Sequence, residues 1–235
     1  MNVLREIFKA YDVRGVYPGE FNETAAEQIG RAFVAYLGAR RIAVGRDMRL
    51  SSPVLKEAFV AGALRQGADV VDYGLIGTDM LYSAVIEDEH DGGVEITASH
   101  NPKQYNGIKL VGRGAVPLSG DAGICDIRDM ILSDAVPAPS PMAGSRSEAD
   151  ILERYLPHVL SFIDLEAMTS SRLVLDAGSG MAGVVAPRLF DALPCDTTRL
   201  CFELDGTFSN HEANPLIEAN RQDLVAAVLD TGADA

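Results

Sequence analysis

The sequence has no tryptophan, three cysteines and no long apolar run. Cys125, Cys195 and Cys201 form no C-x-x-C pair, and an odd set of thiols without metal spacing suits a reducing cytoplasm better than a disulfide framework. No apolar run approaches the roughly 18 residues that span a bilayer, and the N-terminus lacks the apolar core of a signal peptide. We therefore expect a cytoplasmic protein with no membrane partner.

Basic residues are also scarce, 20 against 34 acidic ones, which gives a net charge of −14. This balance argues against nucleic acid and acidic membranes as partners. An acidic chain that binds a phosphate must gather arginine, lysine and backbone N–H groups locally. Its 235 residues, 47% of them hydrophobic, are enough for two domains of ordinary size.

The first half of the chain alternates helix and strand signals, which indicates an α/β layered domain. The connection from Ser99 to Lys109 is too short for a helical crossover, so the strands on either side of it should be antiparallel and the sheet mixed. We expect helices at 23–37 (capped by Asn22 and Gly38), from Ser51 or Ser52 to Gly67, at 80–87 and at 124–132, and strands at 41–44, 69–73, 94–97 and 108–111.

A proline-rich segment, AVPAPSPMAGSRS, separates this domain from a second α/β unit. The expected domains are 1–135 and 148–235, joined by a linker at 136–147. In the second unit we expect helices at 148–162, 184–193 and 222–229 and strands at 173–175 and 200–204, with a glycine-rich turn after the first strand.

That turn, LVLDAGSGMAG, is similar to the first motif of S-adenosylmethionine-dependent methyltransferases. Glu203 or Asp205, at the end of the next expected strand, is then a candidate ribose ligand. Such a domain needs several more strands after Asp205. Glycines that let a helix pack closely on a sheet also explain the turn.

The stretch VEITASHNPKQYNGIK carries the strongest functional signal. A strand ends in a polar turn with Ser99 and His100, where a hydroxyl nucleophile can lie beside exposed backbone N–H groups. A serine hydrolase is disfavoured, because the nucleophile motif G-x-S-x-G is absent and neighbouring side chains of an extended segment point apart. Arg14, in a loop beside Gly15, is a candidate phosphate ligand.

The segments IFKAYDVRG, GRDMRLSSP, ITASHNP with YNGIK, VLDAGSGMAG and ELDGTFSNHEANP together resemble the α-D-phosphohexomutase superfamily, and bacterial phosphomannomutase/phosphoglucomutase members in particular. The resemblance implies two α/β domains, each a mixed sheet sandwiched by helices, the second one incomplete. It also implies an isomerase that moves a phosphoryl group between C1 and C6 of a hexose phosphate, through a phosphoserine and a hexose 1,6-bisphosphate.

The resemblance further implies the site residues. Ser99 would carry the phosphoryl group and, through it, bind Mg²⁺. Lys109 would act as general acid/base or stabilise charge, and His100 would flank the reacting group. The implied substrate-binding residues are Tyr11, Arg14, His100, Asn101 and Lys109.

One family feature is missing from the sequence. The aspartate loop D-G-D-x-D-R that completes the Mg²⁺ site in the family has no counterpart, since no D-x-D-x-D occurs. We expect the N-terminal part of a longer enzyme, inactive alone, with an exposed sheet edge that can support a dimer. Phosphoglucosamine mutase and phosphopentomutase remain alternatives within the family.

Overall fold

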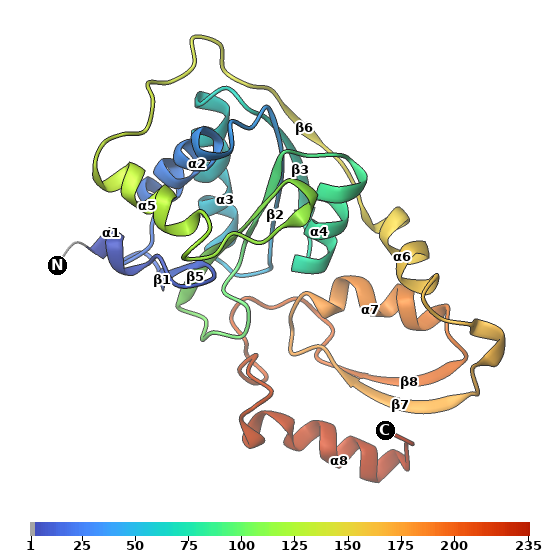
Figure 1. Cartoon of the computed structure of the whole chain (residues 1–235). Coiled ribbons are helices and arrows are strands. Elements are labelled where there is room, and N and C mark those ends of the chain that lie inside the picture. The colour runs from blue at the N-terminus through green and yellow to red at the C-terminus, as the bar shows by residue number, and fades with distance from the viewer. Residues whose placement is uncertain (1–2) are drawn as a thin grey trace. The chain divides into compact units, whose positions relative to one another are not determined.

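The computed structural model describes residues 3–235 (Figure 1). Its contacts divide the chain into two compact units. Unit 1 comprises the described residues up to Ala98 together with Gln104–Ile151, and unit 2 comprises Ser99–Lys103 and Leu152–Ala235. No helix within 3–235 is long and apolar enough to cross a membrane.

Unit 1 is built on a six-stranded sheet in the order β1-β5-β4-β2-β3-β6. The strand β5 runs antiparallel to both β1 and β4, whereas the other pairs are parallel, so the predicted mixed sheet is confirmed. The strands are β1 (Val13–Val16), β2 (Arg41–Arg46), β3 (Asp69–Leu75), β4 (Gly92–Ile96), β5 (Tyr105–Gly112) and β6 (Arg146–Glu148). The helices are α1 (Val3–Glu6), α2 (Glu23–Leu37), α3 (Ser52–Arg65), α4 (Thr78–Glu87) and α5 (Ile124–Leu132), with a short 3₁₀ turn, η1 (Arg113–Ala115).

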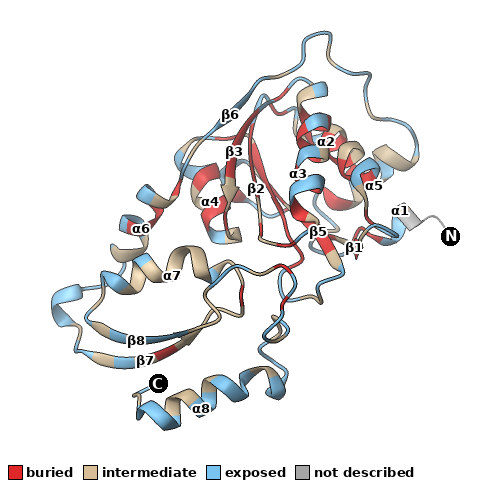
Figure 2. Cartoon of the chain, turned by 180° about the vertical axis from the view of Figure 1, so that it is seen from behind, coloured by how far each residue is buried: buried red, intermediate tan, exposed pale blue. Residues whose placement is uncertain are grey.

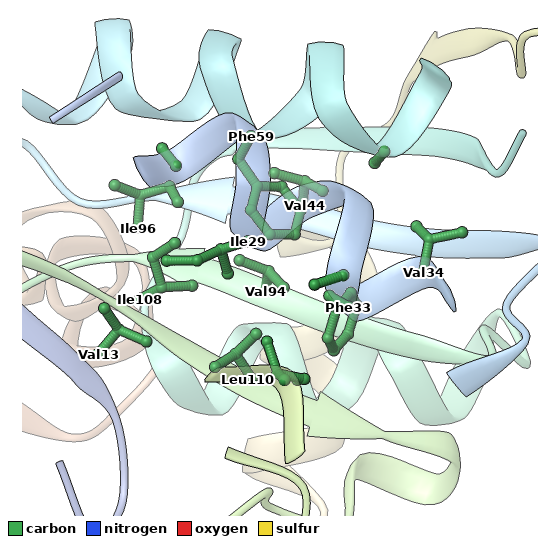
Figure 3. Close-up of a cluster of buried hydrophobic side chains, with 14 of the residues drawn as sticks. Val13, Ile29, Phe33, Val34, Val44, Phe59, Val94, Ile96, Ile108 and Leu110 are labelled. Carbon is green, nitrogen blue, oxygen red and sulfur yellow. The ribbon is translucent and has the colours of Figure 1, made fainter. Parts of the chain in front are cut away.

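The two faces of this sheet are covered by different helices. A side chain added at Gly92 would meet Phe33 and Leu37 of α2, whereas one added at the next residue, Gly93, would meet Leu81 and Val85 of α4. Since successive strand residues face opposite sides, α2 and α4 lie on opposite faces. The α2 face carries the main apolar core, in which strand residues such as Val44, Val94, Ile96 and Ile108 pack against Ile29, Phe33 and Phe59 (Figure 3).

Two glycines let α2 and α3 approach closely. A Cβ atom at Gly30 of α2 would lie 2.3 Å from the carbonyl oxygen of Phe59, and one at Gly62 of α3 would lie 2.1 Å from the carbonyl oxygen of Glu27. Each helix therefore presents a glycine to the other's backbone. The predicted caps of α2 are confirmed, because the Asn22 side chain accepts a hydrogen bond from the Ala25 N–H at 3.1 Å and Gly38 is left-handed.

The segment 136–147, expected as a linker, lies along unit 1 and ends in β6, which pairs in parallel with β3. Arg146 anchors it through a two-pronged ion pair with Glu57 (2.7 and 3.0 Å) and a contact with Asp72. Burial opposes ionisation of Asp72, but Lys56, Arg146 and the Gly74 N–H together hold its pKa below the ordinary value. Backbone hydrogen bonds, such as that from the Val70 N–H to the Ser145 carbonyl at 2.8 Å, act together with these ion pairs to hold the segment on unit 1.

Unit 2 contains a parallel pair of strands, β7 (Ser171–Asp176) and β8 (Cys195–Leu200). Its helices are α6 (Leu152–Leu160), α7 (Ala182–Asp191) and α8 (Gln222–Thr231), with short 3₁₀ turns η2 (Leu165–Ala167) and η3 (Glu218–Arg221). The strand expected at 200–204 is wrong, because the chain turns at Cys201, whose φ of 53° is left-handed. No residue of α7 or α8 is fully buried, as their tan and blue colours show (Figure 2).

Candidate functional site

The face of the unit 1 sheet opposite the main core carries charged residues from three adjacent strands. On β5, Gly107 and Lys109 face away from Ile108, which lies in that core. Arg14 of β1 is in register with Gly107, and Glu95 of β4 is in register with Lys109. Arg14, Lys109 and Glu95 therefore share one face, with Gly107 contributing no side chain between them.

Arg14 has a second guanidinium near it. Its own Nη2 donates to the carboxylate of Asp12, and its side chain is 15% exposed. The neighbouring Arg49 is 1% exposed, and its pKa is lowered chiefly by burial and further by the positive charge of Arg14, against the opposing effect of Asp47. The two neighbouring guanidinium groups, one of them reaching solvent, supply planar donors for an anion, and each is also paired with an aspartate, Arg14 with Asp12 and Arg49 with Asp47.

A buried hydrogen-bond network holds this cluster in place. Asp47 accepts from the Arg49 N–H at 3.0 Å and from the Ser52 hydroxyl, and Arg49 Nη1 donates to the Tyr105 carbonyl at 3.1 Å. Asn106 Nδ2 donates to the hydroxyls of Ser51 and Ser52 at 2.8 and 3.0 Å. The loop after β2 is thereby joined to the start of β5.

Glu95 is a buried carboxyl on the same face, 2% exposed. The Thr78 hydroxyl, at the first residue of α4, donates to it at 2.5 Å. Burial, helped by Asp47 and Asp79, raises the pKa of Glu95 to about 8, although the Thr78 hydrogen bond and the charge of Lys109 oppose the shift. Near neutral pH this carboxyl is therefore largely protonated.

Ser99 lies in a turn just after β4. Thr97 still donates its N–H to the Gly107 carbonyl at 3.0 Å, and Ser99, two residues later, is exposed with a left-handed φ of 52°. A left-handed non-glycine residue costs on the order of 1 kcal/mol or more and is common at functional turns. The turn also brings Ser99 Oγ to 3.3 Å from His100 Nδ1, so the expectation that these side chains point apart is wrong.

The predicted site residues fall in both units. Arg14 and Lys109 share the polar face of unit 1, and Tyr11 lies in the loop before β1 with 80% of its surface exposed. Ser99, His100 and Asn101 are grouped by their contacts with unit 2. Sequence reasoning missed Arg49, Asn106 and Glu95, whose positions follow from strand register and burial rather than from a local motif.

The carboxylate of Asp205, a candidate ribose ligand, accepts hydrogen bonds from residues of its own loop. Its carboxylate accepts from the N–H and hydroxyl groups of both Thr207 and Ser209, at 2.6 to 3.0 Å. The Ser209 and Thr207 hydrogen bonds hold the pKa of Asp205 well below its ordinary value. This carboxylate is a turn cap, which accounts for one of the two candidate ribose ligands without a nucleotide.

The described residues contain one group of three side chains with metal-ligand spacing, Asp176, Cys201 and His211. A thiol and an imidazole are poor ligands for Mg²⁺, which prefers oxygen. Within 3–235 no set of three carboxylates accompanies Ser99. The residues described here therefore do not fit a magnesium site.

Comparison with known proteins gives consistent matches over nearly the whole chain. The model of phosphoglucomutase/phosphomannomutase α/β/α domain I matches residues 5–134, and that of domain II matches 153–235. A protein named "Phosphohexose mutases" from Xanthomonas campestris is 43% identical over 227 residues, and a phosphomannomutase of Salmonella typhimurium is 40% identical over 233. Each alignment covers 97% of this chain, and the chain spans about half the length of these relatives (50% and 51%).

Among solved structures, a phosphoglucomutase/phosphomannomutase family protein from Burkholderia thailandensis superposes with a TM-score of 0.88 at 36% identity. The match covers 97% of this chain and 51% of the other. These matches leave the methyltransferase interpretation without support.

Proposed function

Because the chain belongs to the phosphoglucomutase/phosphomannomutase family, we propose that it carries the phosphoserine and part of the phosphate-binding surface of a hexose-phosphate mutase. The observation that supports this most is Ser99 itself, exposed and left-handed at the end of β4. The adjoining strands β5 and β1 supply the cations Lys109 and Arg14 on one face. The proposed reaction moves a phosphoryl group between C1 and C6 of a hexose phosphate.

The chemistry runs through two transfers. A sugar hydroxyl attacks the phosphorus on Ser99, the bond from phosphorus to Ser99 Oγ breaks, and a bond to the sugar oxygen forms, which gives a hexose 1,6-bisphosphate. The hydroxyl loses its proton to a base and Oγ gains one. The second transfer reverses these bonds at the other carbon and restores the phosphoserine. Such transfers depend chiefly on positioning and on neutralising the phosphoryl oxygens.

The family resemblance assigns a role to each residue. Lys109, as an ammonium, would donate a proton to Ser99 Oγ or stabilise the phosphoryl charge. Arg14, supported by buried Arg49, would bind phosphate with its planar fork. His100 lies beside Ser99 Oγ and would flank the reacting group. The proposed contacts of Tyr11 and Asn101 with the sugar rest on the family resemblance.

The family implies a metal ion, and Mg²⁺ is the proposed ion. A phosphate oxygen on Ser99 would be one ligand, but the described residues do not supply the carboxylates that would complete an octahedral oxygen site. We therefore assign no step to the metal. On the same ground we propose that these 235 residues alone show no appreciable catalytic turnover of mannose 1-phosphate, so that phosphoryl transfer at Ser99 in this chain is slow and stoichiometric.

Hexose phosphates, with mannose and glucose as the leading sugars, are the proposed substrates, because the relatives are named phosphohexose mutase and phosphomannomutase. A cytoplasmic location is proposed from the three cysteines, all free thiols in the structure. We also propose self-association through the outer edge of β8, with which no described strand pairs.

Intact-protein mass spectrometry tests the central assignment. After incubation with glucose 1,6-bisphosphate and Mg²⁺, the wild-type chain should gain one phosphoryl group and the Ser99→Ala variant none. Ser83→Ala removes another serine hydroxyl, on α4, and should behave as wild type. A wild-type chain that gains no mass, or an Ser99→Ala chain that gains the same mass, would contradict the proposal.

A further inference from the structure

Three segments of unit 2 meet where β7 and β8 end. Asp176 is the last residue of β7, and Cys201 follows the last residue of β8. Because the two strands are parallel and Asp176 is in register with Leu200, the carboxyl ends of both strands lie next to each other. His211, from the loop after β8, completes the group, and the potential ligand atoms of the three residues all lie within 4.8 Å of one another.

The hydrogen bonds of His211 fix which nitrogen is available. Its Nδ1 lies 2.9 Å from the Glu212 carbonyl oxygen, which can only accept, so Nδ1 carries a proton. Its Nε2 lies 3.0 Å from Asp176 Oδ2. When neither carries a proton, Nε2 and Asp176 Oδ2 are both acceptors, so a proton or a metal cation must lie between them. A histidine whose Nδ1–H donates to a carbonyl is oriented as metal-binding histidines are.

The other two side chains are oriented toward the same point. Asp176 Oδ1 accepts from the Gly178 N–H at 2.8 Å, which leaves Oδ2 toward His211. Cys201 is held in a left-handed conformation, with its carbonyl accepting from the Ser179 N–H at 2.8 Å.

We propose that Asp176, Cys201 and His211 bind a Zn²⁺ ion, with a fourth position left for water or another ligand. Zinc accepts a thiolate, an imidazole and a carboxylate together, and its bonds of about 2.0–2.3 Å place tetrahedral donors roughly 3.3–3.8 Å apart. The observed spacing needs only small side-chain movements to reach this geometry. Mg²⁺, a hard ion that requires oxygen donors, does not suit the site.

A bound ion would crosslink the ends of β7 and β8 to the loop that contains His211. Unit 2 has few buried apolar side chains in the part of the chain that the structure describes: Tyr155, Leu156, Val174 and Phe208. A small core of this kind commonly relies on a crosslink or a metal for stability. The proposal is independent of phosphoryl transfer, which concerns Ser99 and the polar face of unit 1.

Cobalt substitution tests the site directly. The metal-free wild-type chain should bind one Co²⁺, with a sulfur-to-cobalt charge-transfer band that Zn²⁺ abolishes by displacement. The band should be lost in Cys201→Ser and retained in Cys195→Ser, a control at the start of β8. Co²⁺ affinity should fall at least tenfold in His211→Gln and in Asp176→Asn, but not in His158→Gln, a control on α6.

Metal binding by the wild-type protein is itself a test of the proposal, and its outcome does not depend on whether the variants fold. A wild-type chain that takes up no stoichiometric Co²⁺ or Zn²⁺ at tens of micromolar contradicts the site. A charge-transfer band that survives in folded Cys201→Ser, or wild-type affinity in folded Asp176→Asn, also contradicts it. Metal binding should release protons from the thiol and the imidazole, which can be measured in weak buffer. In Cys201→Ser, the proton release from the thiol should be lost together with the charge-transfer band.

Discussion

Glu95 and Lys109, directly opposite each other on adjacent strands, illustrate how strand register creates chemistry that no local motif records. The sequence segment ITASHNP identifies Ser99, because the serine and its turn are contiguous in the chain. Glu95 looks like an ordinary polar strand residue until its burial is known. Arg49, in the loop after β2, likewise becomes part of the site only because Arg14 of β1 comes near it.

The pH dependence of stability should report on Glu95. Its folded-state pKa of about 8 exceeds the ordinary 4.5, so between these values the folded state keeps a proton that the unfolded state has lost. The free energy of unfolding therefore falls as pH rises through this window, by on the order of 5 kcal/mol at most. The Glu95→Gln variant, which cannot ionise, should become more stable relative to wild type between pH 5 and 9.

Urea unfolding at several pH values measures this difference. The Glu87→Gln variant, on the exposed surface of α4, is the matched control and should track wild type across the range. A constant difference between Glu95→Gln and wild type from pH 5 to 9 would mean that Glu95 ionises at an ordinary pKa.

At the scale of elements, the sequence predicts helices and strands best where a segment contains its own capping residues or apolar periodicity. The bounds of α2 follow from the Asn22 cap and Gly38, and α5 follows from its apolar periodicity. The short strands β1 and β6 were missed, because neighbouring strands hold them in place. The strand expected at 200–204 has a stronger apolar pattern than β8, yet pairing with β7 makes the more polar segment 195–200 the strand.

The contact between α2 and α3 yields an element-scale prediction. Gly30→Ala improves intrinsic helix propensity by about 1 kcal/mol. The added methyl group, however, would lie 2.3 Å from the Phe59 carbonyl oxygen, and forcing the helices apart typically costs about 1–3 kcal/mol. We expect the steric term to prevail and the urea midpoint of unfolding to fall.

The control for this substitution is Gly19→Ala, since a Cβ atom there meets nothing within 4 Å and Gly19 does not have a positive φ. Its midpoint should remain close to that of wild type. A Gly30→Ala protein as stable as wild type would show that the two helices are not in close contact at this point.

At the scale of the whole molecule, both expected α/β units are present, and the mixed sheet lies in unit 1. The two strands of unit 2 are parallel, because the helix α7 connects them as a crossover. The C-terminal residues hydrogen-bond along the outer edge of β7, where the Val174 N–H donates to the Ala235 carbonyl at 2.9 Å. The outer edge of β8 has no such cover from a described strand.

This open edge should make association depend on concentration. We expect the mass measured by light scattering after size-exclusion chromatography to rise from monomer toward dimer as the loading concentration increases from about 5 to 500 μM. Replacing Thr197, whose N–H faces the outer edge of β8, with proline should weaken association if the edge mediates it. A monomer mass at every concentration would contradict self-association.

The role of Ser99 as a phosphoryl carrier is tested most directly by a chase experiment. The wild-type chain is first phosphorylated with glucose 1,6-bisphosphate, separated from it and mixed with mannose 1-phosphate, and Ser99 is followed by tandem mass spectrometry. The account predicts that the phosphoryl group is found on Ser99 and leaves faster with the sugar phosphate than in buffer, appearing in mannose 1,6-bisphosphate. A phosphoryl group on another residue, or one whose loss the sugar phosphate does not accelerate, would contradict it.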